Sequence, residues 1–198
     1  MHSYQNKVFV IGFQKTGTTS LGQALEILGY RVCGTVGAND PHIAETVFDR
    51  IKPLLDQYSA FQDNPWCVLY EDLDKQFPNS KFILTIRQSE KWILSVLNHF
   101  GSTYRPLNKW IYGVDFPLGN EQVFINRYER HNREVLSYFK DRPDDLLVIS
   151  SNQDYSWTRV CDFLGKPKPS VPFPYLNKSQ LPFKNRSVIR AKNFLFRK

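Results

Sequence analysis

One segment near the amino terminus limits the folds open to this chain more than any other. Residues 7–11 (KVFVI) form an apolar run short enough for a buried β-strand, and residues 12–19 (GFQKTGTT) follow as a loop rich in glycine and threonine. The apolar residues of one helix face come next, at Leu21, Ala24, Leu25 and Leu28. A strand joined by a tight loop to an amphipathic helix is the building unit of α/β proteins.

Apolar runs and helix-period segments continue to alternate along the chain. Further strands are expected at residues 31–33, 58–62, 81–86 and 146–150. Helices are expected from about 43 until Pro53 bends or ends the helix, at 66–77, from a cap at Ser89 to about 100, at 121–140 and at 157–164. Residues 101–119, rich in glycine, proline and aromatic side chains, are expected to form a loop. The alternation predicts an α/β fold with a parallel central sheet flanked by helices on both faces, which binds ligands at the carboxyl ends of its strands.

Length and composition narrow the class of protein further. The 198 residues suit one domain over residues 1–198, with an irregular proline-rich and basic segment from about residue 166. We expect a cytoplasmic protein without a membrane span, because no apolar run approaches about 20 residues and no signal-peptide pattern opens the chain. The three cysteines form no CxxC pair, which predicts no metal centre. A net charge of +7 favours an anionic ligand.

The loop at residues 12–19 has the composition of an anion-binding site. Gly12 and Gly17 permit positive backbone φ angles, so that successive N–H groups can converge on one point. The amino terminus of the following helix adds partial positive charge at the same place. The loop is therefore predicted to bind phosphate or sulfate.

The same loop departs from the nucleotide-binding pattern GxxxxGK[ST]. Its glycines and Thr19 are in register with that pattern, but Thr18 stands in the lysine position and the lysine lies earlier, at Lys15. The two clearest expected strands end in Arg87 and Ser150 rather than in the aspartate that helps to hold Mg²⁺ in nucleoside triphosphatases. The pattern favours a site that neutralises anionic oxygens through protein groups alone.

Two segments together resemble the P-loop sulfotransferases. In that family a KxGTT loop binds the 5′-phosphosulfate of PAPS (3′-phosphoadenosine 5′-phosphosulfate), and an arginine ending a strand, with a serine eight residues later, binds the 3′-phosphate. Residues 15–19 (KTGTT), Arg87 and Ser95 match in type and order, although Gln88-Ser89 replaces the usual Asp/Asn-Pro. Residues 171–177 (VPFPYLN) resemble the PFPxxN segment of a compact branch of the family. The resemblance covers most of the chain and implies a P-loop kinase-like fold.

The resemblance implies an enzyme that transfers a sulfuryl group from PAPS to a hydroxyl or amine acceptor, releases PAP (the 3′,5′-bisphosphate) and uses no metal. The donor-binding residues that it implies are Gln14, Lys15, Thr16, Gly17, Thr18, Thr19, Arg87 and Ser95. Lys15 would also stabilise the negative charge that develops on the leaving phosphate. Lys184 and Arg186 in the basic tail are further donor-binding candidates, with a merely solvated tail as the alternative.

The acceptor must lose a proton, which requires a general base. Many members of the family carry a histidine two residues before a proline, at the end of the strand that precedes the 3′-phosphate motif, and here that position is Asp63. Its carboxylate suits the role if burial raises its pKa toward neutrality. The alternative is that Asp63 or Asn64 only caps the next helix. His99 and His42 are weaker candidates, because neither has an identifiable carboxylate partner.

Two other functions fit parts of the sequence. A Mg-ATP-dependent kinase or nucleoside triphosphatase would share the loop but needs a metal-binding acid. A non-enzymatic nucleic-acid-binding domain would use the basic tail and an aromatic loop, although we do not expect nucleic acid as a partner. The expected acceptor is a small molecule or glycan, bound by residues 34–41 and 101–119. The aromatic residues of the latter segment, which form either an apolar wall or core, are Tyr104, Trp110, Tyr112 and Phe116.

Overall fold

The computed structural model, which describes residues 6–150 and 154–175, contains a five-stranded, all-parallel sheet with the strand order β2-β3-β1-β4-β5. The strands are β1 (Val8–Val10), β2 (Val32–Cys33), β3 (Ala60–Gln62), β4 (Lys81–Thr85) and β5 (Leu146–Ile149). Because β1 lies between β3 and β4, segments far apart in the sequence meet where these three strands end. The parallel α/β fold predicted from the alternation is confirmed.

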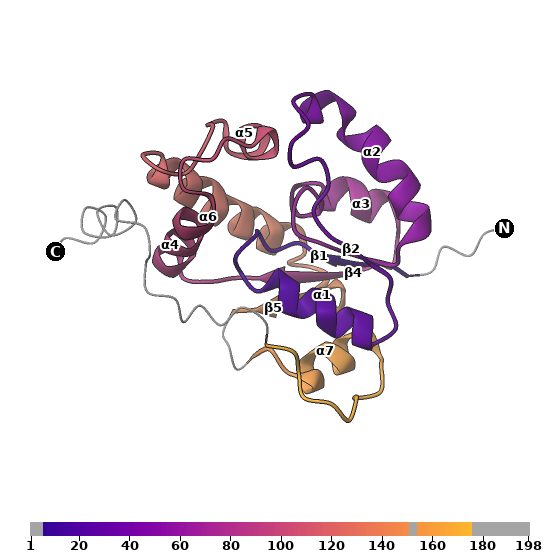
Figure 1. The fold of residues 1–198 in the computed structure, drawn as a ribbon. Helices are drawn as coiled ribbons and strands as arrows, with labels where there is room; N and C mark the ends of the chain where they lie inside the picture. The colour runs from indigo at the N-terminus through magenta and orange to yellow at the C-terminus, as the bar shows by residue number, and fades with distance from the viewer. Residues whose placement is uncertain (1–5, 151–153, 176–198) are drawn as a thin grey trace.

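Helices cover both faces of this sheet (Figure 1). One face carries α1 (Thr18–Ile27) and α7 (Trp157–Leu164). The other face carries α2 (Ile43–Gln57), α3 (Tyr70–Gln76), α4 (Ser89–Phe100), α5 (Pro106–Tyr112) and α6 (Glu121–Tyr138). Two short 3₁₀ helices, η1 (Trp66–Val68) and η2 (Pro143–Asp145), also lie within the described residues. None of the helices in the described ranges is long and apolar enough to cross a membrane.

The alternating side chains of β1 divide the interior into two cores. Val8 and Val10 point into the core beneath α1 and α7, whereas Phe9 points into the core on the other face. The Phe9 ring stacks on Phe61 of β3 at 5.1 Å and on Phe82 of β4 at 5.4 Å, between ring centroids. Since these are its register partners in the neighbouring strands, the aromatic stack fixes the centre of the sheet.

The structure corrects two predictions about helices: of the two outcomes expected at Pro53, a bend or an end, it excludes the end, and it contains a helix in the expected loop at 101–119. Pro53 lies inside α2, which continues to Gln57. The Lys7 ammonium group donates to the carbonyls of Leu55 at 2.6 Å and Tyr58 at 3.0 Å, so the carboxyl end of α2 is satisfied beyond the proline. The expected loop at 101–119 contains α5, which begins at Pro106, where a fixed φ favours a first helical turn.

Gly12 connects β1 to the glycine-rich loop, and steric contact with Thr85 requires a glycine there. It does not adopt a positive φ angle, contrary to the expectation for this glycine. A Cβ atom at Gly12 would lie 1.9 Å from the Thr85 Oγ1 atom and 2.5 Å from the Thr85 carbonyl oxygen. The absence of a side chain therefore lets the loop leave the sheet directly against β4.

We predict opposite effects for two glycine-to-alanine substitutions in this region. Gly12→Ala should lower the free energy of unfolding by about 1–3 kcal/mol, because β4 backbone must move to admit the methyl group. Gly22→Ala in α1 should raise it by about 0.5–1 kcal/mol, because its Cβ atom would make only ordinary contacts and alanine favours a helix. Urea unfolding of both variants measures the difference, and a G12A protein as stable as wild type would contradict this steric account.

Candidate active site

The carbonyl groups of the loop between β1 and α1 are held by donors outside the loop or by its own side chains. The two partners of one of these hydrogen bonds are 139 residues apart in the sequence. The pairs are Phe13 O with Thr16 Oγ1 (2.5 Å), Gln14 O with Trp92 Nε1 (2.9 Å), Lys15 O with Arg87 Nη1 (3.2 Å), Thr16 O with Tyr155 Oη (2.5 Å) and Gly17 O with Ser20 N (3.1 Å). Every carbonyl from residue 13 to residue 17 is therefore engaged.

The orientation of these carbonyls determines where the loop amides point. In a planar trans peptide the N–H group lies opposite the preceding carbonyl, so holding the carbonyls outward turns the N–H groups to the other side. Lys15 and Gly17 both have positive φ angles, 68° and 107°, which lets the chain curl around those N–H groups. The amides of Gly17, Thr18 and Thr19 make no hydrogen bond with any described residue. The loop thus offers unpaired donors at the amino terminus of α1, as an anion site requires.

Lys15 lies between an acidic and a basic group. Burial lowers the pKa of its ammonium group, the nearby Asp63 carboxylate raises that pKa, and the Arg87 guanidinium lowers it. The side chain is half-buried rather than extended into solvent. The three groups come from the ends of neighbouring strands: Lys15 follows β1, Asp63 follows β3 and Arg87 follows β4. The sheet therefore brings together the two residues predicted to be catalytic and the predicted phosphate-binding arginine.

Asp63 does not cap a helix. Its Oδ1 atom accepts a hydrogen bond from the Asn64 amide at 2.8 Å, and its carboxylate also accepts one from Thr35. Burial raises the pKa of Asp63 above 3.8, although these hydrogen bonds and Lys15 oppose the shift. Its φ angle of 73° is unusual for a residue other than glycine. The structure therefore removes the capping alternative for Asp63 and leaves a desolvated carboxylate beside Lys15.

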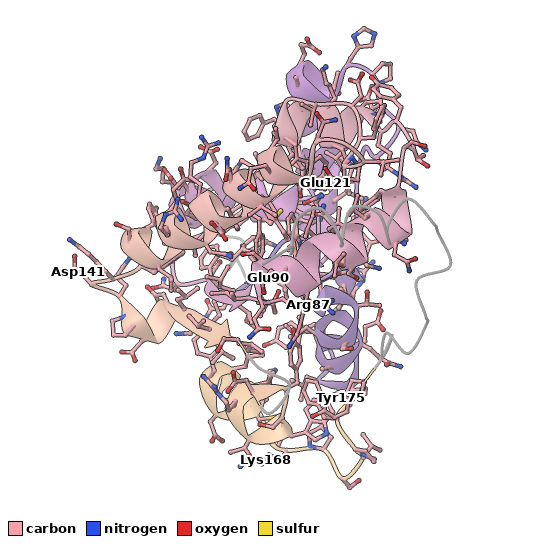
Figure 2. The ribbon with its side chains drawn as sticks, turned by 90° about the vertical axis from the view of Figure 1, so that its left-hand side faces the viewer. Arg87, Glu90, Glu121, Asp141, Lys168 and Tyr175 are labelled. Atoms are coloured by element: carbon pink, nitrogen blue, oxygen red, sulfur yellow. The ribbon has the colours of Figure 1, made fainter. Side chains whose placement is uncertain are left out.

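Two hydrogen bonds fix the backbone of Arg87 at the edge of the sheet. The Tyr128 hydroxyl accepts a hydrogen bond from the Arg87 amide at 2.7 Å and donates one to the Arg87 carbonyl at 2.8 Å. A cavity of about 420 Å³ opens beside this residue, and Ser89, Asn132 and Arg133 are among its lining residues. Figure 2 looks onto this edge of the molecule and labels Arg87 at the foot of α4. Arg87 can thus reach both the loop and an open space next to it.

The α4 face that carries Trp92 also carries Ser95 and His99. These residues are three and seven positions after Trp92, which donates to the loop carbonyl of Gln14. Ser95 is half-buried, does not line the cavity beside Arg87, and makes no hydrogen bond with any described residue. Burial lowers the pKa of His99, and so do Lys15 and Arg105. His99 is therefore close enough to Lys15 for the ammonium charge to lower the pKa of its ring. The position of His99 near the end of a helix did not indicate this proximity.

The side chains of Gln14 and Thr16 face the protein interior. Gln14 donates to the Tyr112 hydroxyl at 2.7 Å and accepts from the Asn64 side chain at 2.9 Å. The Thr16 hydroxyl lies 2.5 Å from the hydroxyl of Thr85 as well as from Phe13 O. Of the predicted donor-binding residues, these two can therefore contact an anion only through their backbone.

The remaining predictions concern Ser89, His42, the basic tail and a metal site. Ser89 does not cap α4, because Gln88 occupies the cap position and the Ser89 hydroxyl donates to Glu129 at 2.6 Å. His42 lies at the beginning of α2, and Lys184 and Arg186 lie outside the described residues. In residues 6–150 and 154–175, no group of three or more His, Cys, Asp and Glu side chains is placed to hold a metal ion.

The sequence analysis did not identify the residues whose side chains hydrogen-bond to the backbone of the loop, of Arg87 and of Ile11. These are Trp92, Tyr128, Tyr155 and His131, whose Nε2 atom lies 2.7 Å from the Ile11 carbonyl. Burial lowers the pKa of His131 to about 4, so the ring is neutral near pH 7, and Nε2 must carry the proton because a carbonyl only accepts. No local pattern distinguishes these aromatic residues from ordinary core residues.

Comparison with known proteins identifies the family. The sequence model described as "Sulfotransferase domain" matches residues 7–118 and 96–181, so the chain belongs to the sulfotransferase domain family. Ava biosynthesis cluster protein M from Aspergillus versicolor is 26% identical over 213 residues, covering 86% of this chain and 80% of that protein. The crystal structure of a sulfotransferase from Alicyclobacillus acidocaldarius has the same fold, with a TM-score of 0.56 and 14% identity over 97% of this chain and 91% of that one.

We predict that Asp63→Asn stabilises the folded protein at neutral pH. A buried carboxyl whose folded pKa is raised costs stability at any pH where it is ionised, and an amide removes that cost. The advantage over wild type should be complete above the raised pKa and vanish as the pH falls to the unfolded value near 3.8.

Chemical unfolding at several pH values measures this difference. Asp74→Asn is the matched control, because it removes the negative charge and one of the two carboxylate oxygens that accept hydrogen bonds from Arg142, at 3.2 and 2.7 Å, and should destabilise the protein. A loss of stability in D63N at neutral pH would mean that the charge pairing with Lys15 outweighs burial.

Proposed function

We propose that this protein is a PAPS-dependent sulfotransferase whose donor site is the loop between β1 and α1. The observation that carries the proposal is the set of unpaired amides at Gly17, Thr18 and Thr19, next to the half-buried Lys15. Membership of the sulfotransferase domain family supports this function over the phosphoryl transfer that the loop alone would also allow.

The positively charged groups of the site would match the two anionic parts of PAPS, its 5′-phosphosulfate and its 3′-phosphate. The loop amides and Lys15 would bind the 5′-phosphosulfate, since unpaired N–H groups and an ammonium group both favour anionic oxygens. Arg87 would bind the 3′-phosphate, with the cavity of about 420 Å³ beside it providing room. Ser95 belongs to the same proposed set because its hydroxyl is not committed to a described residue. When bound, PAPS would supply the sulfuryl group and a phosphate leaving group.

Lys15 and Asp63 would then have complementary roles in the transfer. Asp63 would accept the proton that the acceptor hydroxyl or amine loses as its new bond to sulfur forms. Lys15 and the loop amides would stabilise the negative charge that appears on the bridging oxygen as the bond from sulfur to that oxygen breaks. The raised pKa of Asp63 makes its carboxylate a stronger base than an exposed aspartate.

The acceptor side of the site would be formed by residues 34–41 and by α5. Thr35 in the first segment donates to the Asp63 carboxylate, which places that segment next to the proposed base. Tyr112 belongs to the core, stacked on Phe124 at 3.8 Å, whereas Tyr104 is exposed.

Binding of the bisphosphate product tests the donor site without knowledge of the acceptor. PAP at about 100 times its Kd should stabilise wild type by about 2.7 kcal/mol without added metal. Lys15→Ala should abolish this stabilisation and Arg87→Ala should weaken it, whereas Lys52→Ala, an exposed lysine on α2, should leave it unchanged. Thermal unfolding measures all four proteins. Stabilisation of wild type by ATP with Mg²⁺ and not by PAP would contradict the proposal and favour a kinase.

The role of Asp63 is tested by activity with an acceptor found by screening. Asp63→Asn should lower kcat by about 10²–10⁴-fold while PAP binding persists, and should remove the fall of kcat/KM at acidic pH that protonation of Asp63 causes in wild type. His99→Asn is the matched comparison, and it should lower kcat less than about tenfold. An inactive H99N protein beside an active D63N protein would assign the base to His99 instead.

A further inference from the structure

The proline-rich segment after α7 packs against Tyr155 rather than running free over the surface. Phe173 is 8% exposed and makes edge contacts with the rings of Tyr155 at 6.3 Å and Trp157 at 4.9 Å, between centroids. The Tyr175 hydroxyl donates to the Tyr155 carbonyl at 2.7 Å, and the Trp157 indole donates to the Val171 carbonyl at 2.6 Å. Residues 171–175, hereafter the PFP segment, thus hold Tyr155 through both its ring and its backbone.

Tyr155 in turn contacts the glycine-rich loop at two points. Its hydroxyl donates to the Thr16 carbonyl at 2.5 Å. A Cβ atom at Gly17 would lie 2.2 Å from the same hydroxyl oxygen, so the side chain of Tyr155 occupies the space that any residue larger than glycine would need. Tyr155 is 8% exposed and therefore has little freedom to move away.

This contact bears directly on the unpaired amides. The Thr16 carbonyl and the Gly17 N–H group belong to one peptide plane, so a hydrogen bond to the carbonyl fixes the direction of the N–H group. Gly17 has a φ angle of 107°, in a region where glycine has little steric resistance to rotation, so the plane before it needs an outside partner to stay in place. Among the described residues, the Tyr155 hydroxyl is the hydrogen-bond partner of the Thr16 carbonyl.

We propose that Tyr155 is a positioning residue for the anion-binding loop, and that the PFP segment acts on the loop through Tyr155. The proposal rests on the proposed donor site. It assigns a role to the PFP segment, which lies apart from Lys15, Asp63 and Arg87 in the chain. Tyr155 fixes the Gly17 peptide plane, and the PFP segment fixes Tyr155.

Tyr155→Phe removes the hydroxyl and retains the ring that packs on Phe173. The loss of one hydrogen bond should raise the Kd for PAP by about threefold to tenfold. The KM for the donor should rise with it, while the KM for the acceptor stays unchanged, a split that a general loss of stability does not cause. NMR relaxation should also show lower order parameters for the amides of Gly17, Thr18 and Thr19 in the free variant.

Tyr175→Phe tests whether the PFP segment acts through Tyr155. Alone, Tyr175→Phe should raise the Kd for PAP, but by less than Y155F does. It releases the Tyr155 backbone but leaves the hydrogen bond from the Tyr155 hydroxyl to the Thr16 carbonyl formed. In a Y155F background it should have almost no further effect on PAP binding. Fully additive effects of the two substitutions would overturn the proposed route.

Tyr138→Phe is the matched control, because it also removes a partly buried hydroxyl group, one that donates to Asp74 at 2.8 Å. Tyr138 does not contact the loop. PAP affinity and loop order parameters equal to wild type are expected for Y138F. If Y155F matches Y138F in both measurements, the positioning role is wrong. If wild type does not bind PAP at all, the donor proposal fails, whereas the order parameters of Y155F still decide whether Tyr155 positions the loop.

Discussion

The hydrogen bonds that hold the loop carbonyls from Phe13 to Gly17 are the interactions on which the rest of this site depends. Each satisfies a carbonyl and, because the peptide is planar, also directs the next N–H group toward the anion site. A glycine-rich loop without these partners would sample many conformations, since glycine carries a large conformational entropy. Three of the five donors come from α4, from the end of β4 and from the segment after β5, so the loop becomes fully ordered only once the sheet has formed.

The same site concentrates features that disfavour folding. Lys15 and Asp63 both have positive φ angles, which cost on the order of 1–3 kcal/mol each in residues other than glycine. Burial also opposes the charged forms of both side chains, as their shifted pKa values indicate. The aromatic stack of Phe9, Phe61 and Phe82 joins β1, β3 and β4 and stabilises the strands after which these residues lie. Strain and desolvation at a site supported by a well-packed core are typical of binding and catalysis.

Much of the fold follows from local patterns in the sequence, and the exceptions can be traced to particular residues. Apolar runs and helix periodicity located the strands and most helices, because burial on one or both faces imposes those patterns. The continuation of α2 past Pro53 depends instead on contacts that only the folded chain makes, such as the Lys7 side chain at the end of α2, whereas α5 begins at a local signal, Pro106 in its first turn. In the site, residue type and order identified Lys15 and Arg87, but the burial of the Gln14 and Thr16 side chains was invisible before the neighbouring elements were placed.

The sequence by itself determined that this chain forms a parallel α/β sheet, that a glycine-rich loop follows its first strand, and that the loop suits an anion. These properties depend on periodicity and on the conformational freedom of glycine, which act over a few neighbouring residues. Only the tertiary structure decided which way the loop amides point and which carboxylate lies near Lys15. The direction of the amides depends on partners 72, 78 and 139 residues away in the chain, Arg87, Trp92 and Tyr155. The proximity of Asp63 to Lys15 depends on the pairing of β1 with β3. No local pattern encodes such partners, because their positions exist only once the strands have paired.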